Sequence, residues 1–148
     1  MSALRNYIKY FPKDRVKSNL NKHLYHSNNE QLQLFDVTLR DGLQTQKTLY
    51  TVQEKYNIYK NIVKYHNPKS IEIGSIVSKN VLPQLANTIE LFNFIQNQEF
   101  HNRKPKLYVL TPSIKSLKTA INNNIMNYSF ITSVSEEFQL KNTKKSLF

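Results

Sequence analysis

Short apolar runs alternate along this chain with longer stretches in which apolar residues recur every three or four positions, and this alternation most restricts the fold. The short runs predict four strands, at residues 34–39, 70–74, 106–110 and 128–132. The longer stretches predict three helices, at residues 52–65, 78–95 and 112–125. Because a strand–helix–strand unit packs as a right-handed crossover between parallel strands, this order predicts an α/β fold with a parallel sheet of about four βα units.

Each predicted helix has an expected cap and an expected buried stripe. Thr51 and Glu54 form a capping box at the first helix. Ser78 and Thr111 are the expected caps of the other two. The apolar spacing predicts the buried stripes Val52, Tyr56, Tyr59 and Val63; Leu82, Leu85, Ile89, Phe92 and Ile95; and Ile114, Leu117, Ile121 and Ile125.

Gly42 and Gly74 are the only two glycines in the chain, and each closes an apolar run that carries charge near its end. Arg40 and Asp41 come immediately before Gly42, and Glu72 lies two residues before Gly74. Ligands bind where parallel strands end, so these charged residues are the candidate site. Side chains alternate faces along a strand, so Glu72 should point away from its apolar neighbours. We expect each glycine where a side chain would block a turn or the approach of a ligand.

The charged residues at these strand ends suit a definite chemistry. Arg40 can face an anionic or enolate oxygen, while Asp41 can supply one ligand to a hard cation such as Mg²⁺. Glu72 can orient Arg40 or a substrate. The alternative is an ion pair of Arg40 with Glu72 or Asp41 that only satisfies charges at a sheet edge. From the residues alone, the two interpretations are even.

Other polar residues are less informative. The four histidines are scattered, and we interpret them as ordinary surface residues. Ser133, Ser135 and Glu136 have no histidine beside them in sequence, so a loop or helix cap is the better interpretation than a nucleophilic site. With no cysteine, the chain is neither a disulfide scaffold nor a protein that uses a thiol ligand or nucleophile.

Charge and hydropathy restrict partners and location. No apolar run approaches the roughly 20 residues that span a bilayer, so we expect no membrane protein but a soluble, intracellular one. The net charge of +11 predicts attraction to polyanions such as nucleic acid, acidic surfaces or phosphorylated cofactors, without choosing among them.

Residues 1–30 are predicted to form a basic N-terminal extension ahead of a domain at residues 31–148. Basic and aromatic residues interleave there, and Asp14 is the only acid before Glu30. One interpretation is a nucleic-acid-binding arm, with basic groups on phosphates and aromatic rings stacked on bases. A second is an organelle-targeting segment. We favour a third, a solvated extension of a lysine-rich protein.

Several segments together carry a resemblance to a known family. The run 38–44, from Thr38 through Arg40, Asp41 and Gly42 to Gln44, resembles the signature that opens the metal-dependent aldol-type lyases and synthases on (βα)₈ barrels. Within that group, later segments are similar to 3-hydroxy-3-methylglutaryl-CoA lyases, at residues 71–78, 81–86, 109–112 and 133–142. The match runs through residues 34–142 in the order and spacing of the family.

The resemblance implies a truncated (βα)₈ TIM-barrel domain. It also implies a lyase that cleaves 3-hydroxy-3-methylglutaryl-CoA, an acyl-CoA, to acetyl-CoA and acetoacetate with Mg²⁺ or Mn²⁺. Asp41 corresponds to the metal-binding aspartate, Arg40 to the arginine that stabilises the enolate oxygen, and Glu72 to an active-site acid; Gln44 lies beside the metal. The family's two histidine ligands, its asparagine ligand and its loop cysteine have no counterpart in this chain. We therefore expect a weak metal site and a chain that is incomplete and inactive alone.

A half barrel leaves two strand edges and an inward apolar face uncovered. We therefore expect the chain to self-associate or to bind a partner that completes the barrel. Two alternatives to a lyase remain. One is a non-enzymatic half-barrel binding or assembly protein, and the other is a basic nucleic-acid-binding protein acting through residues 1–30.

Overall fold

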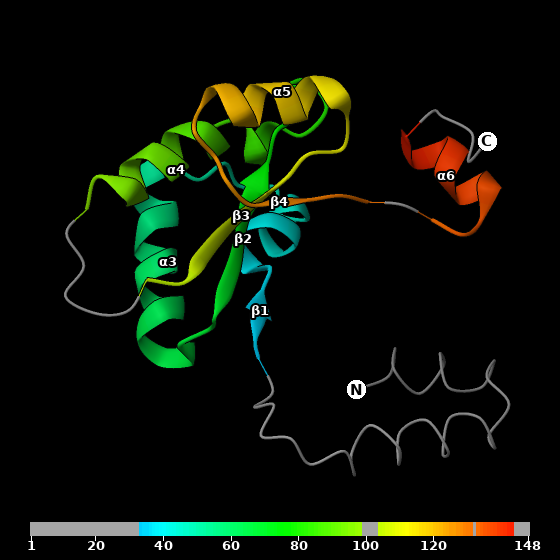
Figure 1. The fold of residues 1–148 in the computed structure, drawn as a ribbon. Coiled ribbons are helices and arrows are strands. Elements are labelled where there is room, and N and C mark those ends of the chain that lie inside the picture. The colour runs from blue at the N-terminus through cyan, green and yellow to red at the C-terminus, as the bar shows by residue number, and fades with distance from the viewer. Residues whose placement is uncertain (1–32, 99–103, 132, 144–148) are drawn as a thin grey trace, which may run out of the picture. The chain divides into compact units, whose positions relative to one another are not determined.

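Four parallel strands form one sheet in the described part of the chain (Figure 1). The structure, a computed structural model, describes residues 33–98, 104–131 and 133–143. The strands are β1 (Phe35–Asp36), β2 (Ser70–Ser75), β3 (Lys106–Leu110) and β4 (Tyr128–Ser129). They pair in chain order, β1-β2-β3-β4, and every pair is parallel. The predicted α/β fold is confirmed, while the predicted extension at residues 1–30 lies outside the described residues.

Helices follow the strands, and three of them lie around one face of the sheet (Figure 1). The α-helices are α3 (Val52–His66), α4 (Thr88–Gln96), α5 (Ile114–Asn122) and α6 (Glu136–Thr143). Two shorter turns are η2 (Thr38–Gly42), a π-helix, and η3 (Pro83–Leu85), a 3₁₀ helix. None of the described helices is long and apolar enough to cross a membrane.

The first strand is shorter than the sequence predicts. The Asp36 carboxylate accepts a hydrogen bond from Thr38 N at 2.9 Å, which turns the chain out of the sheet. The N–H groups of Arg40, Asp41 and Gly42 then all point to the carbonyl of Val37, at 3.1, 2.8 and 3.3 Å. The prediction of a strand through Leu39 was therefore wrong, and Arg40 and Asp41 lie on a helical turn.

Strand β2 runs through the core and confirms the predicted alternation. Ile71 and Ile73 belong to the core that packs on the helices, whereas Glu72, 2% exposed, turns to the other face. A bulge follows between Glu72 and Ser75. In this bulge a Cβ on Gly74 would lie 2.3 Å from Thr88 Oγ1, so helix α4 packs too closely for any side chain here.

Gly42 differs from Gly74 and corrects one expectation. A Cβ there would meet only Thr38 Cγ2 at 3.6 Å, an ordinary contact, and its φ is not positive. Neither the turn nor the packing of the described residues requires glycine at this position. The other reason expected for this glycine, the approach of a ligand, stays a prediction.

Helix α3 begins where the capping box predicts. Thr51 N donates to the Glu54 carboxylate at 2.8 Å, and Glu54 N donates back to Thr51 Oγ1 at 3.2 Å. The bond from the Thr51 backbone, and then that from its hydroxyl, holds the pKa of Glu54 below its usual value. The fully buried side chains are Lys55, Tyr59 and Ile62, whereas Val52, Tyr56 and Val63 are only partly buried. All four residues of the predicted stripe pack on the core, while Lys55 and Ile62 are buried residues that the prediction did not include.

The starts of the next two helices also differ from the prediction. Ser78 caps no helix, because its carbonyl accepts from Val81 N and Leu82 N in a separate turn, and α4 begins only at Thr88. Ser113, not Thr111, caps α5. Thr111 Oγ1 instead donates to the Ser129 carbonyl at 3.2 Å.

Helix α5 packs differently from the prediction as well. Its buried residues are Ser116 and Ala120, while Ile114 and Ile121 are 68% and 53% exposed. Small side chains let a helix approach a neighbouring layer closely, and this leaves the larger isoleucines outside. The predicted stripe of α5 was therefore wrong at both of these positions.

The end of the described chain is only partly as predicted. Strand β4 stops at Ser129 rather than at residue 132, and Phe130 and Ile131 are 64% and 46% exposed. At the start of α6, Ser135 Oγ accepts from Phe138 N at 3.4 Å, so the interpretation of this serine as a helix cap is confirmed.

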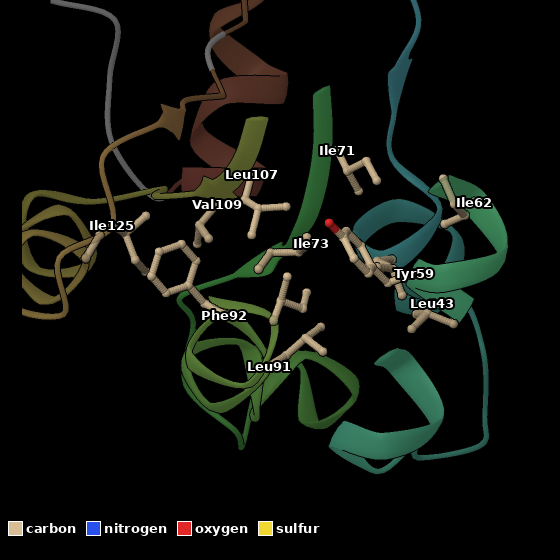
Figure 2. Packing of buried hydrophobic residues seen from close by; sticks show 13 residues of the cluster. Leu43, Tyr59, Ile62, Ile71, Ile73, Leu91, Phe92, Leu107, Val109 and Ile125 are labelled. Atoms are coloured by element: carbon tan, nitrogen blue, oxygen red, sulfur yellow. The ribbon is translucent and has the colours of Figure 1, made fainter. Parts of the chain in front are cut away.

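The core lies between the sheet and its helices. Figure 2 shows Tyr59 of α3 and Phe92 of α4 directed toward Ile71, Ile73 and Val109 of the central strands. Burial, with a further contribution from Tyr56, raises the pKa of Tyr59 to about 12, so the phenol stays neutral.

Candidate functional site

Arg40 is the centre of the charged group that the sequence predicts at the strand ends. Its Nε donates to Glu72 Oε2, and its Nη1 donates to Asp41 Oδ1 at 2.5 Å. The π-helical turn after β1 carries Arg40 and Asp41, and the neighbouring strand β2 carries Glu72. The structure thus brings together three of the four predicted site residues.

Exposure distinguishes the roles that these three side chains can take. The Glu72 side chain is 3% exposed, that of Arg40 is 17% and that of Asp41 is 61%. The rings of Phe35 on β1 and Tyr108 on β3 meet edge to face at 5.1 Å, and Tyr108 is the strand neighbour of Glu72. Glu72 therefore lies at the base of the site, while Arg40 and Asp41 reach its open side.

Ser129 is a site residue that the sequence reasoning missed. Its hydroxyl donates to Glu72 Oε1, so both oxygens of the Glu72 carboxylate are hydrogen-bonded, one to β4 and one to Arg40. The available signal was a lone hydroxyl between Tyr128 and Phe130 in the last apolar run. An alternating strand directs such a residue to the opposite face from its neighbours.

The guanidinium of Arg40 retains donors for a ligand. A guanidinium carries five N–H groups, of which Nε and one on Nη1 are used. Among the described residues, no side chain or backbone oxygen accepts a hydrogen bond from Nη2. Arg40 is thus oriented by two carboxylates and can still bind an oxyanion.

The described residues do not fit a complete metal site. They contain no group of three or more histidine, aspartate or glutamate side chains that could hold an ion. Asp41 offers one carboxylate, and Arg40 already binds one of its oxygens. Mg²⁺ requires six ligands in a nearly ideal octahedron. Gln44 is half-buried after the π-helical turn and makes no hydrogen bond to Arg40, Asp41 or Glu72 in the described part of the chain.

A buried lysine supports the loops beside this site, and the sequence reasoning missed it. Lys55 is 1% exposed, and its Nζ donates to the Gln84 carbonyl and to Asn87 Oδ1, both at 2.5 Å. Asn87 Nδ2 in turn donates to the Tyr50 carbonyl at 3.1 Å. Together they tie the loop after β1 to the loop after β2. Burial lowers the pKa of Lys55 to about 8, although the charge of Glu90 opposes this shift.

Parallel strands with covering helices, and a charged cluster where the strands end, define a protein of the (βα)-barrel class. A family model described as HMGL-like matches residues 31–147. The chain therefore belongs to the HMGL-like family.

Individual relatives agree with this assignment. The chain is 28% identical over 111 residues to the mitochondrial hydroxymethylglutaryl-CoA lyase of Arabidopsis thaliana, covering 75% of this chain and 23% of that protein. It is 30% identical over 118 residues to the mitochondrial enzyme of Mus musculus, covering 80% and 35%. The chain thus spans well under half the length of these relatives.

Solved structures show the same partial match. The hydroxymethylglutaryl-CoA lyase of Pseudomonas aeruginosa superposes with a TM-score of 0.68 at 26% identity, covering 79% of this chain and 37% of that one. An HMG-CoA lyase from Acinetobacter baumannii, solved in complex with coenzyme A and 3-methylmalate, gives a TM-score of 0.67 at 24% identity, covering 78% and 36%. The described fold is therefore part of a TIM barrel of the HMG-CoA lyase type.

Proposed function

We propose that this chain provides the enolate-stabilising part of a hydroxymethylglutaryl-CoA lyase site and takes an acyl-CoA as its ligand. The observation that carries the proposal is Arg40, oriented by Glu72 and Asp41 with Nη2 left for an oxyanion. Membership of the HMGL-like family supports the class of reaction, and the names of the relatives support the class of substrate.

The reaction explains why an oriented arginine is useful. Cleavage breaks a carbon–carbon bond of the acyl chain, and its electron pair forms the enolate of acetyl-CoA. The tertiary hydroxyl loses its proton as it becomes the ketone of acetoacetate, and the enolate carbon then gains a proton. Arg40 would stabilise the negative oxygen that develops on the enolate, and an oriented donor of this kind acts without reorganisation during the reaction.

Glu72 has a positioning role in this proposal. Both of its oxygens already accept hydrogen bonds, from Arg40 and from Ser129, which leaves it poorly placed to receive the substrate proton. Asp41, with a side chain 61% exposed, is the acid at this edge that faces solvent. A cation bound here would be held by Asp41 and water alone, and we therefore propose only weak binding of Mg²⁺ or Mn²⁺.

We further propose that the chain alone does not turn over the substrate. The described residues supply no set of three or more side chains that could hold a metal ion beside Arg40. Large apolar side chains are also exposed, including Phe35, Phe130 and Ile131, at 46%, 64% and 46%. A second polypeptide that closes the barrel would cover such surface, and so would a second copy of this chain.

The test has two readouts on the full chain. Isothermal titration with 3-hydroxy-3-methylglutaryl-CoA should show binding that Arg40→Ala weakens at least tenfold and that Arg40→Lys restores only in part, because lysine lacks the planar fork. Acetoacetate release with added Mn²⁺ should stay at background. Binding that Arg40→Ala leaves unchanged would refute the role of Arg40. Wild-type turnover that disappears in Arg40→Ala would refute the proposal that the chain alone is inactive.

A further inference from the structure

The hydroxyl of Ser129 has a partner that does not belong to the β4 ladder. Strand β4 is attached to β3 by backbone bonds, from Val109 N to the Asn127 carbonyl at 3.2 Å and from Thr111 N to the Ser129 carbonyl at 2.9 Å. Thr111 Oγ1 adds a third bond to the same carbonyl at 3.2 Å. The strand is therefore held without the Ser129 side chain. The Ser129 hydroxyl donates to Glu72 on β2, which lies on the other side of β3 in the sheet.

This contact completes a chain of hydrogen bonds across the sheet. Ser129 Oγ donates to one oxygen of Glu72, Arg40 Nε donates to the other, and Arg40 Nη1 donates to Asp41. A buried carboxylate with one free oxygen can rotate about its terminal bond to satisfy that oxygen elsewhere. With both oxygens fixed, the carboxylate plane is fixed, and the direction of the Arg40 fork is fixed with it.

We propose that Ser129 is a positioning residue, which orients the Arg40 guanidinium through Glu72. Its effect on ligand binding rests on the function proposed above, whereas its effect on Arg40 does not. A hydroxyl donor at this position is required, so Ser129→Thr keeps the function if its hydroxyl reaches Glu72, and Ser129→Ala loses it.

The first readout is the Arg40 Nε–H signal in ¹H–¹⁵N spectra, assigned through its loss in Arg40→Lys. In the wild-type protein the bond to Glu72 should slow exchange of this proton with water. In Ser129→Ala we expect this proton to exchange about tenfold faster. A tenfold change corresponds to weakening a hydrogen bond to a charged group that has lost its alignment. Ser129→Thr should stay within about twofold of wild type, by the same measure.

The matched control is Ser75→Ala. Ser75 is a buried serine at the end of β2, whereas Ser129 is half-buried at the end of β4; the Ser75 hydroxyl donates to the Leu110 carbonyl at 3.1 Å and not to Glu72. The Ser75→Ala variant should lower the unfolding midpoint as much as Ser129→Ala does and leave the exchange of the Arg40 Nε proton unchanged. Equal effects of the two variants on Arg40 exchange would show a merely structural role and overturn the proposal. If Ser129→Ala does not fold, Ser129→Cys, which keeps the volume and weakens the donor, takes its place with the same expectation.

The second readout separates this proposal from the proposed function. Affinity for 3-hydroxy-3-methylglutaryl-CoA, measured by titration calorimetry, should fall in Ser129→Ala and not in Ser75→Ala. If the wild-type protein binds no acyl-CoA but Arg40 exchange responds to Ser129→Ala, the proposed function fails and the positioning role stands. If the wild-type protein binds acyl-CoA and Arg40 exchange ignores Ser129→Ala, the positioning role is refuted.

Discussion

Of the two glycines, Gly74 is the one at which the structure predicts a large effect of a single added methyl group. In Gly74→Ala the new Cβ would lie 2.3 Å from Thr88 Oγ1, 2.8 Å from Thr88 Cγ2 and 3.0 Å from Thr88 Cβ. Thr88 is 2% exposed, and its hydroxyl donates to the Leu85 carbonyl at 2.7 Å, so it has no free space to enter. Helix α4 or strand β2 must move.

The magnitude follows from two costs. Forcing an extra methyl group into a packed core costs about 1–3 kcal/mol. Breaking the Thr88 hydroxyl bond to relieve the overlap costs about 1 kcal/mol more. We therefore expect Gly74→Ala to lower the free energy of unfolding by about 2–4 kcal/mol, read from the midpoint of a urea titration followed by circular dichroism.

Two further variants make the test specific. Gly42→Ala meets only an ordinary contact at 3.6 Å and should change stability by less than about 1 kcal/mol, in the stabilising direction because the unfolded chain loses freedom. The double variant with Thr88→Ala removes the two shortest contacts, so it should be more stable than the sum of the single changes predicts. A Gly74→Ala protein as stable as Gly42→Ala, with no coupling to Thr88, would refute the packing argument.

Three other outcomes follow from the described contacts. The pKa of Lys55 is lowered from 10.5 to about 8 in the folded protein, so between these pH values the unfolded chain holds a proton that the folded chain has lost. The free energy of unfolding should therefore rise with pH by up to about 3 kcal/mol relative to that of Lys55→Met. A constant difference between the two proteins in urea titrations from pH 7.5 to 10.5 would contradict this. Whatever Mn²⁺ binding exists should disappear in Asp41→Asn and persist in Asp36→Asn, as followed by water-proton relaxation; equal loss in both would place the ion elsewhere. The purified chain should sediment as a dimer or larger species at low micromolar concentration, because its exposed apolar residues favour association, whereas a stable 17.5 kDa monomer would oppose this.

The sequence determined the fold class and the position of the site by local rules. Apolar periods of two kinds alternate, and alternation of strand and helix leaves a parallel sheet as the compatible arrangement. The capping box at Thr51 and Glu54 involves neighbours three residues apart, so its outcome depends on no distant part of the chain. The meeting of Arg40, Asp41 and Glu72 could be predicted because parallel strands all end at the same edge.

Tertiary packing decided that Lys55 is buried in α3, which face of α5 is buried, and where α4 begins. Lys55 falls within the buried face of α3 because oxygens of Gln84 and Asn87, about 30 positions away in sequence, satisfy its ammonium group. Ile114 and Ile121 face outward because the small residues Ser116 and Ala120 take the inner side of α5. Periodicity marks an apolar stripe but carries no information on which neighbour will meet it.

The roles of Ser129 and the two glycines also depend on the tertiary structure. Ser129 reaches Glu72 only because β2, β3 and β4 lie in order, so a contact between residues 57 positions apart forms across an intervening strand. Gly74 is required because helix α4 returns onto the bulge of β2, and Gly42, alike in sequence context, meets no such neighbour. Local sequence sets backbone preferences, whereas steric exclusion and long-range hydrogen bonds exist only after the chain has folded.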